Sequence, residues 1–262
     1  MKKQTTAYAA ALYEAQISKQ AIPAFSSLNP DFTVDQAYEV QMINVAKQLA
    51  GGDIISGKKI GLTSLAMQKL LNVAEPDFGH LFQSMDCFDG KIDSSKLLQP
   101  KIEAEIAFIL KADLSGGAVT VTDVLKATDY LVAAFEVVDS RIADWKIKLP
   151  DTIADNASSG CYVLGTKRIA PKTLDLATVT LSLYKTKAGK EELINQGSGY
   201  DVLGHPAVAV AWLANKLWHY GVSLQAGEVI LSGALSAAPP AQRGDSFKAV
   251  FSDFGILEAS FI

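Results

Sequence analysis

The spacing of hydrophobic residues changes from helical to strand-like near residue 57. Before this point apolar residues recur every three or four positions, which predicts helices over residues 4–21 and 33–51. Thr33 is a good N-cap for the second helix, and Gly51-Gly52 ends it. Helical spacing returns at 121–130, with Thr122-Asp123 as capping signals, and at 204–220. Short apolar runs predict a strand pair over 172–187 and single strands over 58–62, 78–82, 101–110, 133–138, 228–232, 246–251 and 257–261.

These elements predict an α+β fold in which a small helical N-terminal part, residues 1–56, lies against a β-rich body, residues 57–262, that forms one compact unit. The net charge of −4, without a basic stripe, argues against a nucleic-acid partner. No apolar run approaches the about 18 residues that a membrane span needs. Polar residues follow the Met-Lys-Lys start, so no signal peptide is expected, and two cysteines fit a cytoplasmic protein.

Three glutamates lie inside apolar segments, where an unpaired carboxylate is costly. Alternation over 101–110 places Glu103 and Glu105 on one face of a strand, and Glu136 lies in the apolar run 131–138. Two interpretations are open. The three carboxylates form an all-oxygen site for Mg²⁺ or Mn²⁺, or Glu103 and Glu105 face solvent while Glu136 pairs with Arg141 or a lysine.

Other polar residues are candidates for chemistry or for ordinary structural roles. Lys59 begins a predicted strand, and Asp77 lies in a loop between proline and glycine, where turn-forming acids are common. Arg141 is able to hold a carboxylate with two hydrogen bonds, and Ser158 and Ser159 lie in a polar run that suits either a ligand loop or a simple turn. We expect the three histidines, His80, His205 and His219, to be structural. The chain has no motif of a serine hydrolase, a phosphate-binding loop or a zinc protease.

Several of these residues fall in motifs whose order resembles the 2-hydroxypenta-2,4-dienoate (2-keto-4-pentenoate) hydratase family of the fumarylacetoacetate hydrolase superfamily. The resemblance extends from about residue 35 to the end of the chain. The Glu-x-Glu pattern with a later glutamate is common to the superfamily, whereas the stretch 140–146 followed by 155–160 is similar to the hydratases in particular. The motifs occupy residues 59–64, 76–79, 103–105, 136–141, 151–160, 203–206 and 232–235.

The resemblance implies a mixed β-roll body and a metal-dependent hydro-lyase of aromatic meta-cleavage catabolism. It implies that Glu103, Glu105 and Glu136 bind Mg²⁺ or Mn²⁺ and that Lys59 and Asp77 transfer protons. From their chemistry we expect Arg141, Ser158 and Ser159 to bind substrate. The substrate would be a 2-hydroxy dienoate reacting through its 2-oxo tautomer, and the product would be 4-hydroxy-2-oxopentanoate. The resemblance also implies a homo-oligomer and a possible complex with a decarboxylase or aldolase.

Alternative functions remain open on the same scaffold. A 4-oxalocrotonate (2-oxo-3-hexenedioate) decarboxylase would need a second cation in the pocket for the distal carboxylate of its substrate. Arg141 and Lys146 are candidates for this cation. Gly160 is the main residue that argues against the decarboxylase. An acylpyruvate hydrolase would require a His-Glu pairing, which is not evident in this sequence. A non-catalytic partner subunit of a decarboxylase would have no reason to keep costly buried acids, and a simple Ca²⁺-binding module lacks an EF-hand-like loop.

Overall fold

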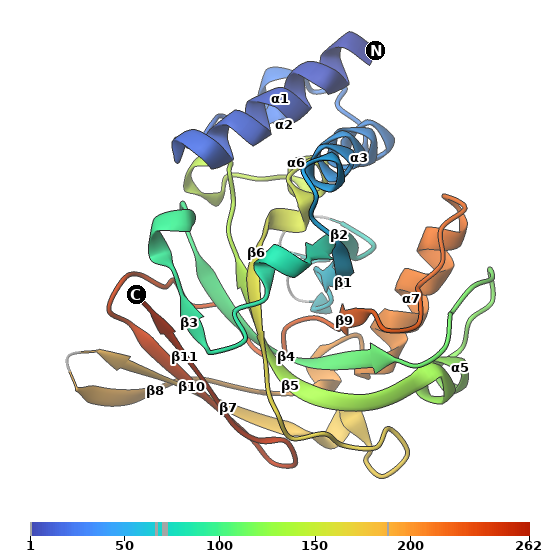
Figure 1. Ribbon diagram of the computed structural model, residues 1–262, viewed down its shortest axis with the longest axis vertical. Helices are drawn as coiled ribbons and strands as arrows, with labels where there is room; N and C mark the ends of the chain where they lie inside the picture. The colour runs from blue at the N-terminus through green and yellow to red at the C-terminus, as the bar shows by residue number, and fades with distance from the viewer. Residues whose placement is uncertain (1, 66–67, 70–72, 188) are drawn as a thin grey trace.

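Two curved β-sheets form the body of the protein, and three N-terminal helices lie above them (Figure 1). The computed structural model describes residues 2–65, 68, 69, 73–187 and 189–262. The α+β class and the mixed β-roll with a small helical N-terminal part are confirmed. In the described part of the chain no helix is long and apolar enough to cross a membrane.

The N-terminal helices are α1 (Lys2–Ser18), α2 (Phe25–Leu28) and α3 (Val34–Ala50). Thr33 caps α3 as predicted, because its side chain accepts a hydrogen bond from the backbone N–H of Gln36. α3 packs against both α1 and α6 (Leu149–Ala154), and this contact connects the helices to the β body.

A six-stranded sheet has the order β2-β1-β9-β4-β5-β6. Its edge strands β2 and β6 also contact each other, so the sheet curls into a nearly closed roll. Neighbouring strands are antiparallel except β1 and β9, which are parallel. The strands are β1 (Ile55–Gly61), β2 (Asp77–Phe82), β4 (Lys101–Leu110), β5 (Thr128–Val138), β6 (Ser159–Leu164) and β9 (Val229–Leu231).

A second sheet, ordered β3-β11-β10-β7-β8, packs with the first around the main hydrophobic core. Its strands are β3 (Lys91–Ile92), β7 (Thr180–Lys187), β8 (Lys190–Ser198), β10 (Ser246–Phe251) and β11 (Gly255–Phe261). Helices α5 (Val121–Ala127) and α7 (Pro206–Trp218) pack against each other beside the roll (Figure 1). A smaller apolar cluster lies on the inner face of the roll: Leu81, Ala107, Val132, Ala134, Tyr162, Val229 and Leu231.

Two predicted elements need correction. The helix predicted over 121–130 ends at Ala127 and is capped by Thr120, because Thr128 already begins β5. The strand pair predicted over 172–187 is a short 3-10 turn, Leu176–Thr178, followed by the single strand β7. The partner of β7 is β8, an edge strand whose exposed polar residues give no alternating hydrophobic signal.

Candidate functional site

The pairing of β4 with β5 brings three glutamates together on the inner face of the roll. Glu103 lies directly opposite Glu136 in the ladder, and Glu105 follows two residues later on the same face. One carboxylate oxygen from each of the three residues lies within 4.8 Å of the others. Glu105 and Glu136 are buried, and Glu103 is half-buried. The predicted convergence of the three carboxylates is therefore seen in the fold.

The contacts of these carboxylates suit a bound cation. Oε2 of Glu105 accepts a hydrogen bond from the backbone N–H of Gly233 at 2.7 Å. Oε1 of Glu105 and Oε2 of Glu136 have no hydrogen-bond partner among the described residues. Burial raises the pKa of Glu105 well above its usual range, and the charges of Glu136 and Glu103 raise it further. Buried carboxylate oxygens without partners are what a hard divalent cation would coordinate, so the donor set fits a metal site.

A buried lysine, Lys59 on β1, faces this cluster. Its Nζ lies 3.0 Å from Oε1 of Glu136 and donates a hydrogen bond to the backbone carbonyl of Ala157 at 3.0 Å. Burial alone would lower the pKa of Lys59, but Glu136, Asp77 and the other two glutamates outweigh it, so the net pKa is raised. Burial raises the pKa of Glu136 to about 7, although the charge of Lys59 opposes this shift. The side chain of Lys59 is therefore held as a cation inside the roll.

Asp77 was expected in a loop but is the first residue of β2, because its backbone pairs with Gly61 of β1. This pairing places it next to Lys59. An added Cβ at Gly61 would lie 2.2 Å from Oδ1 of Asp77 and 3.4 Å from Nζ of Lys59. Oδ2 of Asp77 accepts a hydrogen bond from the Thr152 hydroxyl at 3.1 Å. Burial raises the pKa of Asp77, against opposing effects from Lys59 and Thr152. Asp77 and Lys59 thus form a buried acid–base pair beside the glutamates.

We predict that Gly61→Ala lowers turnover by about 10²-fold, because displacing a reacting group by about 1 Å has effects of this size. The new methyl group would push the Asp77 carboxylate away from Lys59. The three glutamates lie on other strands, so titration with Mn²⁺ should give the same affinity as in the wild type. Gly51→Ala at the exposed end of α3 is the matched control. Normal turnover in the Gly61→Ala variant would show that the position of Asp77 is unimportant.

A strained turn at residues 156–158 contacts Lys59 of this pair. Asn156, Ala157 and Ser158 all have left-handed backbone angles, with φ of 54°, 50° and 52°. Such angles are unfavourable for residues with side chains and persist where surrounding contacts enforce them. The Asn156 side chain supplies these contacts by exchanging two hydrogen bonds with the backbone of His80, at 2.8 and 2.9 Å. The turn directs the Ala157 carbonyl toward Lys59.

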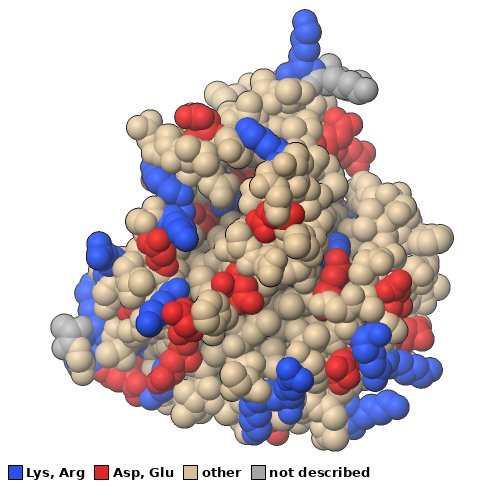
Figure 2. Space-filling model, viewed as in Figure 1, with Lys and Arg blue, Asp and Glu red and all other residues tan. Residues whose placement is uncertain are grey.

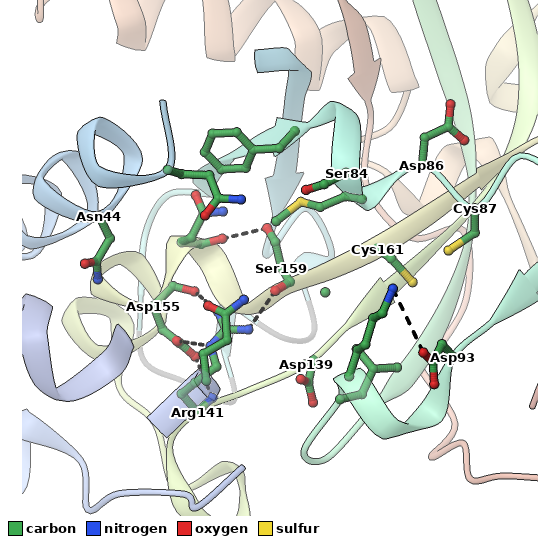
Figure 3. A pocket seen from close by; sticks show the side chains of 18 of the residues that line it. Asn44, Ser84, Asp86, Cys87, Asp93, Asp139, Arg141, Asp155, Ser159 and Cys161 are labelled. Carbon is green, nitrogen blue, oxygen red and sulfur yellow. Dashed lines mark hydrogen bonds and ion pairs between the residues drawn. The ribbon is translucent and has the colours of Figure 1, made fainter. Parts of the chain in front are cut away.

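The three predicted substrate-binding residues occupy different surroundings. Ser158 is buried, and its hydroxyl lies 3.3 Å from that of Thr152, which in turn bonds Asp77. The Ser159 hydroxyl donates to the carbonyl of Asn156 at 2.6 Å. Arg141 is buried and its guanidinium donates to the Asp155 carboxylate and to the carbonyls of Asp155 and Ser159 (Figure 3). The ion-pair partner of Arg141 is thus Asp155, whereas that of Glu136 is Lys59.

The histidines have structural contacts. His205 caps α7 by accepting the N–H of Ala207 at 3.1 Å, and His219 follows the helix as its C-cap. His80 is buried with its Nδ1 at 3.1 Å from the side-chain oxygen of Gln41. Burial and, to a smaller extent, the charge of Lys58 lower the pKa of His80 to about 4.

The low pKa of His80 predicts a specific acid sensitivity. The folded protein keeps His80 neutral, whereas the unfolded chain takes up a proton below about pH 6.5, so stability is lost as the pH falls from 6.5 toward 4. Between pH 7.5 and 5.0 the wild type should lose about 2 kcal/mol more unfolding free energy than His80→Gln. Urea unfolding at both pH values measures this difference. Equal losses in both proteins would show that His80 ionises normally.

Several site features had no separate signal in the sequence. Gly61, Gly233 and Thr152 were seen only as parts of longer motifs. Their roles depend on distances between strands that are far apart along the chain. The Asp-Asn-Ala-Ser-Ser-Gly run did indicate a tight polar loop, because asparagine tolerates left-handed angles better than most residues.

Comparison with known proteins identifies the family of the chain. Residues 90–262, more than half of the chain, match the model of the fumarylacetoacetate hydrolase C-terminal family. The chain is 46% identical to a 2-hydroxyhexa-2,4-dienoate hydratase of Comamonas testosteroni, over 95% of this chain and 94% of that protein. It is 45% identical to a 2-keto-4-pentenoate hydratase of Paraburkholderia xenovorans, over 97% and 93% of the two chains.

A solved structure is also similar over the whole length. The 4-oxalocrotonate decarboxylase of Pseudomonas putida G7, complexed with magnesium and adipate, is 35% identical with a TM-score of 0.94, and the match covers 100% of this chain and 98% of that one. The hydratases are the more similar in sequence, at 45–46% identity. The chain therefore belongs to the fumarylacetoacetate hydrolase family, and within it to the group of 2-keto-4-pentenoate hydratases.

Proposed function

We propose that this enzyme adds water to 2-hydroxypenta-2,4-dienoate and releases 4-hydroxy-2-oxopentanoate. The observation that carries this proposal is the buried group of three glutamates with the Lys59–Asp77 pair beside it. Such a group combines a cation site with two proton-carrying side chains inside one apolar roll. The similarity to named hydratases supports the same reaction.

The reaction moves protons between oxygen and carbon. The hydroxyl of water is added at C4, hydrogens are added at C3 and C5, and the 2-hydroxyl becomes a ketone. Two protons therefore leave oxygen and two reach carbon, which calls for a pair of groups able to hold and release them. Lys59 and Asp77 are that pair in our proposal.

Glu103, Glu105 and Glu136 would hold Mg²⁺ or Mn²⁺, which when bound supplies Lewis-acid polarisation of the 2-oxygen and offsets the charge of the carboxylates. Residues of the chain itself stabilise charge on the substrate and exchange protons with it. Lys59, held as a cation, stabilises negative charge on the substrate near Glu136. Asp77, with its raised pKa, is poised to hold a proton near neutral pH and to exchange it with the substrate.

The remaining polar residues orient these groups. Thr152 fixes the Asp77 carboxylate, and Ser158 extends the same hydrogen-bonded chain toward a water or the substrate carboxylate. Roles for Arg141 and Ser159 in substrate binding stay predictions. Their observed contacts favour support of the 155–159 turn, since each group of the Arg141 guanidinium already donates to a protein acceptor.

The related decarboxylase reaction requires a place for a second carboxylate. Lys146, considered above for this role, is exposed and pairs with Asp144. Gly160 packs so closely that an added Cβ would lie 2.6 Å from the Val137 carbonyl. A larger residue at this position would have to separate β5 from β6 next to Glu136. These two observations favour the hydratase.

We further propose a homo-oligomeric enzyme of the cytoplasm that is able to associate with a decarboxylase or aldolase of the same pathway. On the face shown in Figure 2, basic and acidic side chains are interspersed, without a broad basic field of the kind that binds nucleic acid. Size-exclusion chromatography with light scattering measures the oligomeric state directly.

The test of function is an absorbance assay with freshly generated 2-hydroxypenta-2,4-dienoate. We expect its ultraviolet band to disappear with Mg²⁺ or Mn²⁺ and to persist with EDTA, and the product to be 4-hydroxy-2-oxopentanoate by mass spectrometry. The six-carbon dicarboxylic analogue should release no CO₂. Release of CO₂ would assign the decarboxylase reaction instead, and inactivity on both substrates with metal bound would favour a non-catalytic partner subunit.

A further inference from the structure

The two cysteines of the chain, distant in sequence, meet on the outside of the roll. Asp86 forms a parallel bridge with Tyr162 on β6, and the backbone N–H of Cys87 donates to the Tyr162 carbonyl at 2.8 Å. This pairing holds the backbones of the 86–87 segment and of β6 at the spacing of neighbouring strands. Each thiol changes the pKa of the other, and Figure 3 shows the two cysteine side chains close to each other.

These thiols open into a cleft rather than into the roll. Tyr162 points inward, where its hydroxyl lies 3.0 Å from that of Ser56, so its neighbour Cys161 points to the opposite side of β6. Both cysteines are half-buried and line a cleft of about 430 Å³ between the N-terminal helices and the 83–97 segment. None of the three glutamates lines this cleft. Small molecules thus have a route to the thiols that is separate from the metal site.

The surroundings make the two thiols unequal. The neighbouring Cys161 side chain lowers the pKa of Cys87, and the Cys87 side chain in turn raises the pKa of Cys161, with burial adding to the rise. A thiol with a lowered pKa is the better nucleophile near neutral pH, because the thiolate is the reactive form. Its neighbour is then placed to resolve the product of the first reaction.

We propose that Cys87 and Cys161 form a dithiol modification site that reacts with low-molecular-weight disulfides to give an intrachain disulfide. The Cys87 thiolate attacks one sulfur of the reagent, forms a mixed disulfide and expels one thiolate. Cys161 then loses its proton, attacks the sulfur of Cys87 and expels the second thiolate. Two protein thiols are oxidised and one reagent disulfide is reduced to two thiols, so electrons and protons balance.

The full chain, reduced and then treated with glutathione disulfide, tests this proposal by mass spectrometry. We expect the wild type to lose two hydrogens and to keep no glutathione adduct, with the peptides that contain Cys87 and Cys161 joined within one chain. Cys161→Ser should retain one glutathione on Cys87, and Cys87→Ser should react at least about 10-fold more slowly, because burial still raises the pKa of its remaining thiol. Stable double adducts, disulfides only between chains, or reaction only in urea would each overturn the proposal.

A second measurement reports the geometry without redox chemistry. Phenylarsine oxide condenses with two adjacent thiols and releases water, so it should bind the wild type one to one and dissociate with dithiothreitol. Neither single variant should retain it. The disulfide form should also melt several degrees higher than the reduced form, because the cross-link constrains the unfolded chain. An unchanged melting temperature together with no arsenical binding would show that the thiols are too far apart to form a disulfide.

Discussion

Replacing Glu105 with glutamine is expected to lower kcat/KM for hydration by at least about 10³-fold, or about 4 kcal/mol of transition-state stabilisation. Glutamine keeps the volume and still accepts the Gly233 N–H through its carbonyl oxygen. It removes the negative charge and the free carboxylate oxygen that a cation would use. Titration with Mn²⁺, followed by electron paramagnetic resonance, should show loss of tight binding.

The same substitution is expected to stabilise the metal-free protein by about 1–3 kcal/mol. Burial, followed by the charges of Glu136 and Glu103, raises the pKa of Glu105, so its ionised form is unfavourable in the folded state at pH 8. Urea unfolding in EDTA measures the gain. Glu258→Gln, at an exposed strand glutamate, is the matched control and should change neither kcat/KM nor the unfolding free energy. A Glu105→Gln variant that keeps its metal and its activity would remove Glu105 from the site.

Lys59→Met is expected to lower kcat by about 10³-fold with no loss of metal affinity. Methionine fills similar space, but it leaves Glu136 without the cation that lies 3.0 Å away. Since Lys59 repels a divalent cation, its removal should leave Mn²⁺ binding unchanged or tighter. Intact metal binding with lost turnover would distinguish Lys59→Met from Glu105→Gln, in which we expect both to be lost.

The adjacent Lys58 is the matched control for Lys59. Its side chain forms a buried ion pair with Glu228, away from the three glutamates. Lys58→Met should therefore lower the unfolding free energy, by about 3–5 kcal/mol, because Glu228 is left buried and unpaired. Its kcat, measured below the melting temperature, should stay within a few-fold of the wild type. Equal kcat losses in the two variants would indicate that Lys59 acts only through stability.

The sequence predicted a helix or strand correctly wherever the residues of that segment alone carried the pattern. β4 and β10 have the predicted bounds, and α3 begins after its predicted cap, because alternation and capping depend on neighbouring residues. β8 was missed because its pairing with β7, and not its own pattern, makes it a strand. The end of α5 was misplaced because the chain enters the ladder of β5 at Thr128.

The sequence by itself determined the α+β class and the presence of costly acids inside apolar strands, since both depend on residue type and period. It placed Glu103 and Glu105 on one face, as strand geometry requires. Only the tertiary structure decided that Glu136 lies opposite Glu103, that Lys59 and not Arg141 pairs with Glu136, and that Gly61 leaves space for Asp77. Those relations depend on the register between strands and on the closure of the roll, where a shift of one residue would turn each side chain to the other face.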